Sequence, residues 1–264
     1  MTQGDKVALV TGGGTGIGAA IARRLAADGY AVAVTGRRPG PIQEVASEIG
    51  GLAVVADTGI AADAARAVEE TVERFGGLDA LVCNAGIGGE GSLRDLDPST
   101  WDDVLRTNLT GAFLMARAAI EHLTARRGAI VTVSSAAGLR ACPESLAYCA
   151  SKAGLQMLTQ CLAVDHGPEG VRANCVAPGW VRTPMADAEM TALGERLGTD
   201  RDAAYEACLV DVPLRRAASS DEVAATVAWL LSDEASYVNG VVLPIDGGHT
   251  QVDVATVAFG RLAG

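Results

Sequence analysis

Short apolar runs alternate along the chain with longer stretches in which apolar residues recur every three or four positions. The short runs predict buried strands at residues 7–10, 31–35, 52–55, 80–82, 129–133, 172–176 and 241–245. The longer stretches predict helices at residues 19–27, 41–49, 61–75, 99–123, 147–166 and 221–231. Strands that alternate with helices are typical of an α/β fold with a doubly wound, parallel sheet and helices on both faces. In such folds the ligand crevice lies beyond the carboxyl ends of the strands.

No linker rich in proline, glycine or serine and no run of like charges divides the 264 residues, so we expect a single domain spanning residues 1–264. Residues 186–212, between Pro184 and Pro213, form a helical insert with many acids. The tail at residues 251–264 carries Val252, Val254, Val257, Phe259 and Leu262, which is more apolar surface than a free tail should expose.

Hydrophobic residues make up 49% of the chain and charged residues 20%. This composition indicates much buried surface, including subunit contacts. A net charge of −11 without a basic stripe argues against nucleic acid and anionic membranes as partners. The first six residues lack the basic start and apolar core of a signal peptide, so we expect a cytoplasmic protein with six reduced cysteines. The three histidines are scattered and form no metal motif, so no metal site is expected.

A glycine-rich turn stands between the first predicted strand and the first predicted helix. It reads Thr11-Gly-Gly-Gly-Thr-Gly-Ile-Gly18. Glycines in this position allow a tight turn and a close approach to a pyrophosphate, while the helix N-terminus offers free N–H groups. The turn therefore predicts a nucleotide site, although a glycine turn without a ligand is the ordinary alternative.

Tyr148 and Lys152 lie one helical turn apart, which places them on the same helix face. An ammonium beside a phenol favours the phenolate, so we expect the pKa of Tyr148 to fall toward neutral. A phenol of that kind can exchange a proton with an alcohol or carbonyl oxygen. An isolated Tyr/Lys pair is usually only a surface feature, but here it accompanies the glycine turn. Arg37, Asp57, Asn84, Ser135 and Pro178 each just follow a predicted strand, at the crevice edge of the sheet.

These motifs together resemble the short-chain dehydrogenase/reductase family of about 250 residues, and the resemblance covers nearly the whole chain. The matching motifs are Thr11-Gly12-x-x-x-Gly16-x-Gly18, Asn84-Ala85-Gly86, Asn108, Ser135, Tyr148-x-x-x-Lys152 and Pro178-Gly179-x-x-x-Thr183. Cys83 stands where the family often has another asparagine. The resemblance implies a hydride-transferring oxidoreductase, with the insert at 186–212 as a substrate lid.

The resemblance also implies a role for each catalytic residue. Tyr148 would be the general acid or base, Ser135 would hydrogen-bond the substrate oxygen, and Lys152 would hold the nicotinamide ribose. Asn108 would carry a water that links Lys152 to solvent, or it would simply kink its helix. The implied catalytic set is Asn108, Ser135, Tyr148 and Lys152.

The implied cofactor set follows the carboxyl ends of the strands. It comprises Gly12, Gly14, Thr15, Gly16, Ile17, Gly18, Arg37, Arg38, Asp57, Thr58, Asn84, Ala85, Gly86, Tyr148, Lys152, Pro178, Gly179, Val181 and Thr183. Asp57 would accept a hydrogen bond from the adenine amine, although a turn-forming aspartate is an ordinary alternative. Val181 would act through its backbone groups and Thr183 through its hydroxyl, both toward the nicotinamide carboxamide.

The end of the second predicted strand decides the form of the cofactor. An acid there usually holds the ribose 2′-hydroxyl of NAD, but this chain has Gly36, Arg37 and Arg38 instead. Arginine presents a planar pair of donors to a phosphate, so the sequence favours NADP(H) over NAD(H). Thr15 opposes this interpretation, because phosphate-preferring relatives often have a basic residue there. NAD(H) with solvated arginines remains the alternative.

Side chains of the expected substrate pocket are mostly apolar, so a neutral ketone or secondary alcohol is the expected substrate. The residues expected at the substrate are Ser135, Leu139, Cys142, Tyr148 and Trp180. Trp180 is otherwise a large packed loop residue, and Cys149 is either reactive or a small filler. A nucleotide-sugar epimerase or dehydratase and a catalytically silent dinucleotide-binding regulator are the alternative functions. Apolar positions around most of the circumference of the 147–166 helix predict a homo-oligomer. We expect a homotetramer, with a dimer as the alternative.

Overall fold

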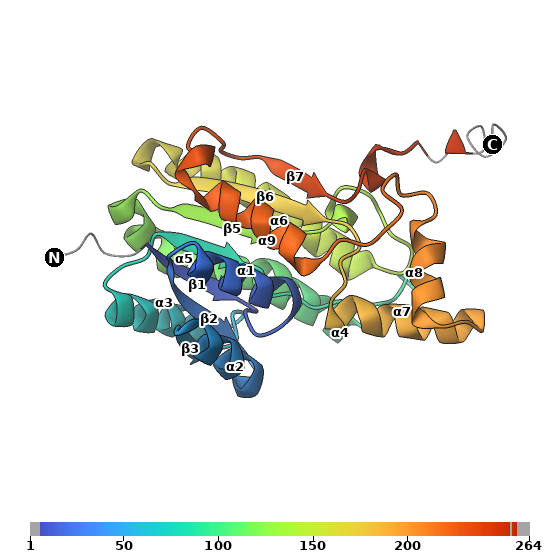
Figure 1. The fold of residues 1–264 in the computed structure, drawn as a ribbon, viewed down its shortest axis with the longest axis horizontal. Coiled ribbons are helices and arrows are strands. Elements are labelled where there is room, and N and C mark those ends of the chain that lie inside the picture. The colour runs from blue at the N-terminus through green and yellow to red at the C-terminus, as the bar shows by residue number, and fades with distance from the viewer. Residues whose placement is uncertain (1–5, 254, 258–264) are drawn as a thin grey trace.

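The computed structural model describes residues 6–253 and 255–257. Its centre is a seven-stranded, all-parallel sheet with the order β3-β2-β1-β4-β5-β6-β7 (Figure 1). The strands are β1 (Val7–Thr11), β2 (Ala31–Gly36), β3 (Leu52–Val55), β4 (Ala80–Cys83), β5 (Ala129–Val133), β6 (Arg172–Pro178) and β7 (Val242–Ile245). The predicted doubly wound fold and its seven strands are confirmed.

Burial on both faces explains why the central strands are continuous apolar runs. Side chains of a strand alternate between the faces, so Ala8 and Val10 of β1 point into one core while Val7 and Leu9 point into the other. All five residues of β1 are buried. The strand that leads into the glycine turn is therefore held by apolar packing from both sides of the sheet.

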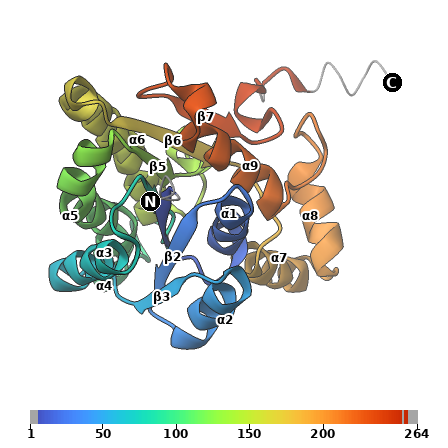
Figure 2. The ribbon, with the colours of Figure 1, turned by 60° about the vertical axis from the view of Figure 1, so that its left-hand side comes forward.

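Helices cover the two faces in separate layers (Figure 2). The first layer consists of α1 (Gly16–Ala27), α2 (Pro39–Ile49) and α9 (Ser220–Leu231). The opposite layer is built from α3 (Ala61–Phe75), α5 (Gly111–Arg126) and α6 (Leu146–His166). At the start of α9, Ser219 and Glu222 form a reciprocal capping box, which satisfies N–H groups that the first turn leaves free.

The single helix expected at residues 99–123 is wrong in one respect. The structure has α4 (Pro98–Leu105), a π-helical turn (Arg106–Thr110) and α5 in direct succession. Asp97 caps α4 by accepting a hydrogen bond from the Ser99 amide at 2.7 Å, which confirms the expected start. A π turn inserts an extra residue into a helix and is frequent at functional sites. Its central residue here is Asn108.

The insert after β6 forms two helices, α7 (Pro184–Leu197) and α8 (Arg201–Leu209). They enclose a small core of their own around Met190 and Tyr205, outside the two sheet cores. The role of these helices as a substrate lid stays a prediction. None of the helices in the described part of the chain is long and apolar enough to cross a membrane. Of the apolar tail at residues 251–264, the residues Val254, Phe259 and Leu262 lie outside the described residues.

Candidate active site

A cleft of about 520 Å³ lies at the carboxyl ends of β1 to β5. This is the edge of the sheet where the fold class places ligands. Most of the residues that the sequence assigned to the cofactor line this cleft. They are Gly12, Gly14, Thr15, Gly16, Ile17, Gly18, Arg37, Arg38, Asp57, Thr58, Asn84, Ala85, Gly86, Tyr148, Lys152 and Thr183.

The glycine turn is shaped by close approaches that only glycine permits. Gly16 begins α1 with a φ of +53° and lies against Thr183. Residues with a side chain rarely adopt that conformation. A β-carbon on Gly18 would overlap the carbonyl oxygen of Gly12. The turn is therefore compact enough to leave the first N–H groups of α1 facing the cleft.

Asn84 anchors the glycine turn to the neighbouring strand. Its amide Nδ2 donates hydrogen bonds to the carbonyls of Thr11 at 2.9 Å and Gly12 at 3.3 Å. In return, the Thr11 hydroxyl accepts hydrogen bonds from the backbone N–H groups of Asn84 at 2.9 Å and Ala85 at 3.0 Å. These contacts fix the floor of the cleft between β1 and β4.

Tyr148 and Lys152 lie on the first turns of α6 and reach the cleft beside β5. The Lys152 ammonium donates to the carbonyl of Val133 at 2.9 Å and lies 5.6 Å from the centre of the Tyr148 ring. Ser135, which follows β5, lies close enough to the Tyr148 hydroxyl to lower the pKa of the phenol. The structure therefore brings the predicted serine, tyrosine and lysine together.

Asn108 joins this group through the π-helical turn. Its side-chain Oδ1 accepts from the Ile87 N–H at 2.8 Å, and its Nδ2 donates to the Ile87 carbonyl at 2.9 Å and to the Ser151 hydroxyl at 3.1 Å. A β-carbon on Gly86 would lie 3.3 Å from both the Asn108 Oδ1 and the Lys152 Nζ. The asparagine oxygen and the ammonium therefore face the same small space.

The expected lowering of the tyrosine pKa is contradicted by the structure. Burial raises the pKa of Tyr148 to about 12, although the nearby Ser135 acts in the opposite direction. Burial also lowers the pKa of Lys152 to about 8. Burial is the largest cause of both shifts, and the ammonium donates its hydrogen bond to the Val133 carbonyl. Desolvation thus outweighs the attraction that the helical spacing suggested.

The basic end of β2 opens onto the cleft as expected. Arg37 and Arg38 are exposed there, and Gly36 beside them lines the same wall. Asp57 accepts hydrogen bonds from the Gly59 N–H at 2.9 Å and from Arg106 at 3.1 Å. Burial alone would raise the pKa of Asp57, but these two hydrogen bonds and the charges of Arg106 and Arg37 bring it below its ordinary value. Asp57 therefore closes a turn and also lines the cleft, and its contact with the adenine amine stays a prediction.

Three predicted cofactor residues do not line the cleft. Pro178 ends β6, Gly179 packs against Asp246, and the buried Val181 pairs in a parallel bridge with Ala218. Their proposed contacts with the nicotinamide stay predictions. Thr183 does line the cleft, and its hydroxyl caps α7 by accepting from the Ala186 N–H at 3.2 Å.

The expected substrate residues lie at and beyond the edge of this cleft. Leu139 and Cys142 belong to the segment between β5 and α6, which leads into Tyr148. Trp180 packs edge-to-face on Tyr205 with ring centres 6.4 Å apart, so it is a packed residue of the insert. The contacts of these residues with substrate stay predictions.

Several residues of the cleft were missed by the sequence analysis. They are Pro41, Ile42, Ala56, Ile87, Thr107, Val133, Ser134, Pro184 and Met185. Ile87 and Pro184 directly follow quoted motifs, so their proximity was a usable signal. Nothing in the sequence showed that the first turn of α2 folds back over the glycine turn.

Glu189 of α7 is one of the many acids of the insert. It is close enough to Tyr148 for its charge to raise the pKa of the phenol. Burial and the charge of Glu90 raise the pKa of the Glu189 carboxyl itself. The acid is therefore a part of the mouth of the active site.

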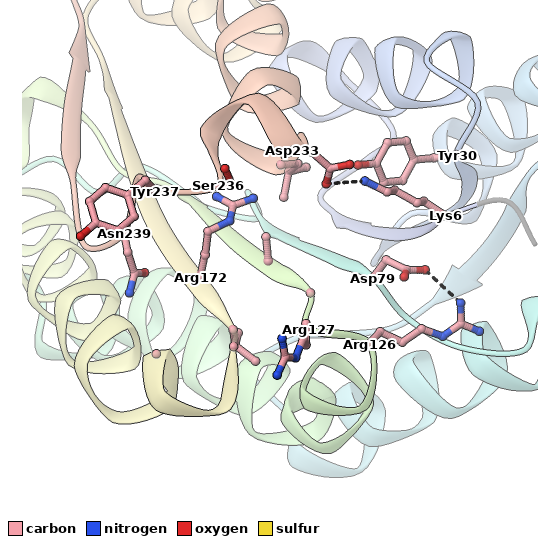
Figure 3. A pocket seen from close by; sticks show the side chains of 16 residues that line it. Lys6, Tyr30, Asp79, Arg126, Arg127, Arg172, Asp233, Ser236, Tyr237 and Asn239 are labelled. Carbon is pink, nitrogen blue, oxygen red and sulfur yellow. Dashed lines mark hydrogen bonds and ion pairs between the residues drawn. The ribbon is translucent and has the colours of Figure 1, made fainter.

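A second hollow of about 570 Å³ lies at the amino ends of the strands (Figure 3). Its charges are mostly engaged within the protein: Lys6 pairs with Asp233 at 2.9 Å, and Arg126 lies 3.5 Å from Asp79. Arg172 donates to the backbone carbonyls of Leu230, Ser232 and Val238. This hollow contains none of the predicted site residues, so we assign the chemistry to the cleft at the carboxyl ends. Among the described residues, no group of three or more His, Cys, Asp or Glu side chains is placed to hold a metal ion.

A family model described as enoyl-(acyl carrier protein) reductase matches residues 12–250. The protein MoaE of Klebsiella aerogenes is 41% identical over 257 residues, which cover 96% of this chain and 99% of MoaE. Levodione reductase of Leifsonia aquatica is 37% identical over 255 residues, which cover 93% of this chain and 94% of that protein.

Solved structures agree with these similarities. A crystal structure of levodione reductase matches with a TM-score of 0.90 at 34% identity, over 94% of this chain and 99% of that chain. A 3-ketoacyl-(acyl-carrier-protein) reductase from Brucella melitensis, solved in complex with NADH, matches with a TM-score of 0.84 at 32% identity. That match covers 94% of this chain and 100% of the Brucella chain.

Proposed function

Because the chain belongs to the short-chain dehydrogenase/reductase family of oxidoreductases, we propose that it transfers a hydride between a nicotinamide cofactor and a neutral ketone or secondary alcohol. In this proposal Tyr148 is the general acid or base. The observation that carries it is the contact of Tyr148 with Ser135 and its closeness to Lys152 at the edge of the cleft.

The residues of the cleft fit a dinucleotide. The hydroxyl Oγ1 of Thr107 is buried at the cleft wall and has no hydrogen-bond partner among the described residues, so a ligand would satisfy it. The N-terminus of α1 offers N–H groups and a positive dipole end to a pyrophosphate. Lys152 would hold ribose hydroxyls. When bound, the nicotinamide supplies or accepts the hydride.

Tyr148 and Ser135 then have different roles at the substrate oxygen, proton transfer and hydrogen bonding. The tyrosine hydroxyl gives its proton to the oxygen of a ketone as that oxygen gains charge, and it takes the proton back during alcohol oxidation. Ser135 donates a hydrogen bond to the same oxygen and stabilises the developing charge. A pKa of about 12 keeps Tyr148 protonated near neutral pH, which suits it to the reductive direction.

Asn108 and Lys152 support the proton transfer. The side-chain amide of Asn108 is held by Ile87 and Ser151, so the asparagine is fixed in position. Its Oδ1 keeps one lone pair and faces the space that the Lys152 ammonium also faces. A water in that space would link the lysine to solvent, which is the relay that we propose.

Acids at the mouth of the site support a neutral substrate over an anionic one. Glu189 acts electrostatically on Tyr148, and Glu90 lies near enough to raise the pKa of Glu189. Two carboxyls at the mouth would repel a strongly anionic acyl carrier or coenzyme A ester. The relatives include both a levodione reductase and a 3-ketoacyl-(acyl-carrier-protein) reductase, so the preference for a neutral substrate rests on these carboxyls and not on the relatives.

The first experiment is a panel of ketones and secondary alcohols with each nicotinamide cofactor, followed by the absorbance of the reduced nicotinamide. We expect turnover with neutral carbonyl compounds and less with their carboxylate analogues. A nucleotide-sugar epimerase or dehydratase would show no net change of the nicotinamide absorbance. A regulator would bind the cofactor and turn nothing over. Either result would refute the proposed reaction.

Arg37 and Arg38 support NADP(H) over NAD(H), because both line the cleft beside Gly36 and no acid ends β2. In wild-type enzyme, kcat/KM should be higher with NADPH than with NADH. Arg37→Ala should lower kcat/KM for NADPH about tenfold and leave kcat/KM for NADH nearly unchanged. A tenfold effect is at the low end for the loss of a hydrogen bond between charged groups, because Arg37 is exposed. Arg74→Ala, an exposed arginine on α3, is the matched control. Equal or better kcat/KM with NADH would overturn the preference.

We also propose a homotetramer in the cytoplasm. Phe113 of α5 is 44% exposed, and Met157 and Val164 of α6 are 60% and 74% exposed. That is more apolar surface than a lone monomer should present on two helices. The six cysteines are free thiols, as a reducing compartment would keep them. Light scattering at micromolar concentration tests the assembly, and a monomeric mass would exclude it.

A further inference from the structure

Two cysteines meet beside the catalytic tyrosine. Cys142 is exposed in the segment between β5 and α6, and Cys149 directly follows Tyr148 in the first turns of α6. The backbone N–H of Cys142 donates to the sulfur of Cys149 at 3.4 Å, and the Cys142 thiol donates to the carbonyl of Arg140 at 3.8 Å. Burial, followed by the nearby Cys149 thiol, raises the pKa of Cys142. The sulfurs are therefore neighbours although seven residues separate them in sequence.

The backbone between the two cysteines is built to bring them together. Glu144 has a φ of +53°. This value lies in the left-handed region, which disfavours residues other than glycine. The Glu144 carbonyl accepts a hydrogen bond from the Gly91 N–H at 2.8 Å, and Ser145 forms a parallel bridge with Gly91. A chain turn held from outside in this way keeps Cys142 folded back onto the start of α6.

We propose that Cys142 and Cys149 form a reversible disulfide that regulates access to Tyr148. The distance of 3.4 Å between the Cys142 amide nitrogen and the Cys149 sulfur places the two residues side by side, which a disulfide requires. The other four cysteines do not share this arrangement: Cys83 and Cys175 are buried in the sheet, and Cys161 and Cys208 lie on α6 and α8.

The chemistry requires an oxidant of the hydroperoxide class. Burial and the nearby Cys149 thiol raise the pKa of Cys142, so only a minor thiolate fraction of this exposed thiol reacts. That thiolate attacks the peroxide oxygen, forms a sulfenic acid and releases water from hydrogen peroxide. The Cys149 sulfur then attacks the sulfenic sulfur, the S–S bond forms and a second water leaves. Two thiols are thus oxidised by two electrons while one peroxide is reduced to two waters. A small thiol such as glutathione reverses the step by two thiol–disulfide exchanges.

The disulfide would act on substrate and not on cofactor. Forming an S–S bond of about 2.05 Å draws the 142–145 segment onto the first turn of α6, next to the phenol. Both thiols are already near enough to Tyr148 for a charge on either to raise the pKa of the phenol. The residues of the glycine turn lie across the cleft and are not displaced. We therefore expect oxidation to lower kcat/KM for the carbonyl substrate and to leave cofactor affinity unchanged.

The test treats the purified full-length enzyme with hydrogen peroxide, then blocks free thiols and maps disulfides by peptide mass spectrometry. The wild type should lose two thiols to a Cys142–Cys149 cross-link that dithiothreitol reverses. Cys142→Ser and Cys149→Ser should form no cross-link, and Cys161→Ser, an exposed control on α6, should behave like wild type. If Cys142 and Cys149 remain reduced, or pair with other cysteines, the proposal is wrong.

Activity is the second readout, and it rests on the proposed function, whereas the mapping does not. Oxidised wild type should show kcat/KM lowered about tenfold or more, since small displacements beside a reacting group have large effects on rate. Its dissociation constant for the nicotinamide cofactor, measured by fluorescence, should not change. Each serine variant is compared with itself before and after peroxide and should be insensitive. A cross-link that forms without changing kcat/KM would refute the regulatory role.

Discussion

Lys152 is one of two lysines in the chain and is 4% exposed, so its charge should make the stability of the protein depend on pH. The ammonium donates to the Val133 carbonyl but forms no ion pair with a carboxylate among the described residues. Burial therefore penalises the charged form and lowers the pKa of Lys152 to about 8. In the unfolded chain the pKa returns to its ordinary value of 10.5.

The sign of the effect follows from the protons that each state binds. Between pH 8 and 10.5 the unfolded chain keeps the proton while the folded chain has lost it, so the free energy of unfolding rises with pH. Below pH 8 both states carry the ammonium, and the folded state bears the full penalty. The two pKa values correspond to about 3 kcal/mol at most, of which about 2 kcal/mol should develop between pH of about 7.5 and about 10.

The measurement is urea-induced unfolding, followed by tryptophan fluorescence at several pH values in that range. Lys152→Met removes the titrating group while keeping a long apolar side chain, so wild type should gain about 2 kcal/mol relative to this variant as pH rises. Lys6→Met is the control, because a hydrogen-bonded ion pair with Asp233 raises the pKa of Lys6 above its ordinary value. If the free energy of unfolding depends on pH in the same way for wild type and Lys152→Met, the inferred burial penalty on the Lys152 ammonium is refuted.

Three further substitutions test the site. Tyr148→Phe should lower kcat by about 10²- to 10⁴-fold and leave cofactor affinity unchanged. Steady-state kinetics and fluorescence titration measure these two quantities. Retention of more than about a tenth of kcat would point to another proton donor. Asn108→Ala should lower the free energy of unfolding in urea by about 2–4 kcal/mol. The reason is that it leaves the backbone polar groups of Ile87 unpaired, and an unchanged midpoint would contradict this. Gly18→Ala should abolish cofactor binding by calorimetry, because its methyl group would overlap the Gly12 backbone, whereas Gly40→Ala has open space and should bind normally.

The sequence was sufficient to predict the strands of the sheet because each strand is a short apolar run. Runs such as β1 are apolar throughout because both faces of the parallel sheet are buried. The sequence was also sufficient for most of the cleft, since the carboxyl ends of parallel strands share one edge. The sequence was insufficient for properties that depend on contacts between residues far apart in the chain. The pKa of Tyr148 depends on how deeply the folded chain buries the phenol, and helical spacing carries no information on that.

Other differences have the same origin. Residues that follow a strand were all placed at the cleft, yet Val181 continues past the edge and pairs with Ala218, which only the fold of the insert reveals. Glu189 is one of many acids in the insert, and only its position on α7 relative to Tyr148 sets it apart. Ile42 reaches the cleft because α2 packs back onto the glycine turn.

The π-helical turn at Arg106–Thr110 also sets the rotational phase of the helix that contains it. Each residue of a regular helix advances the side-chain direction by about 100°, so one extra residue rotates the faces of α5 relative to those of α4. Deleting one residue from this turn would restore ideal helical geometry. It would also swing Asn108 or all of α5 by about a quarter of a turn, away from Ile87 or from α3. A regular α-helix at residues 106–110 would thus be incompatible with the present position of Asn108. A deletion that removes the π turn would displace either Asn108 or α5.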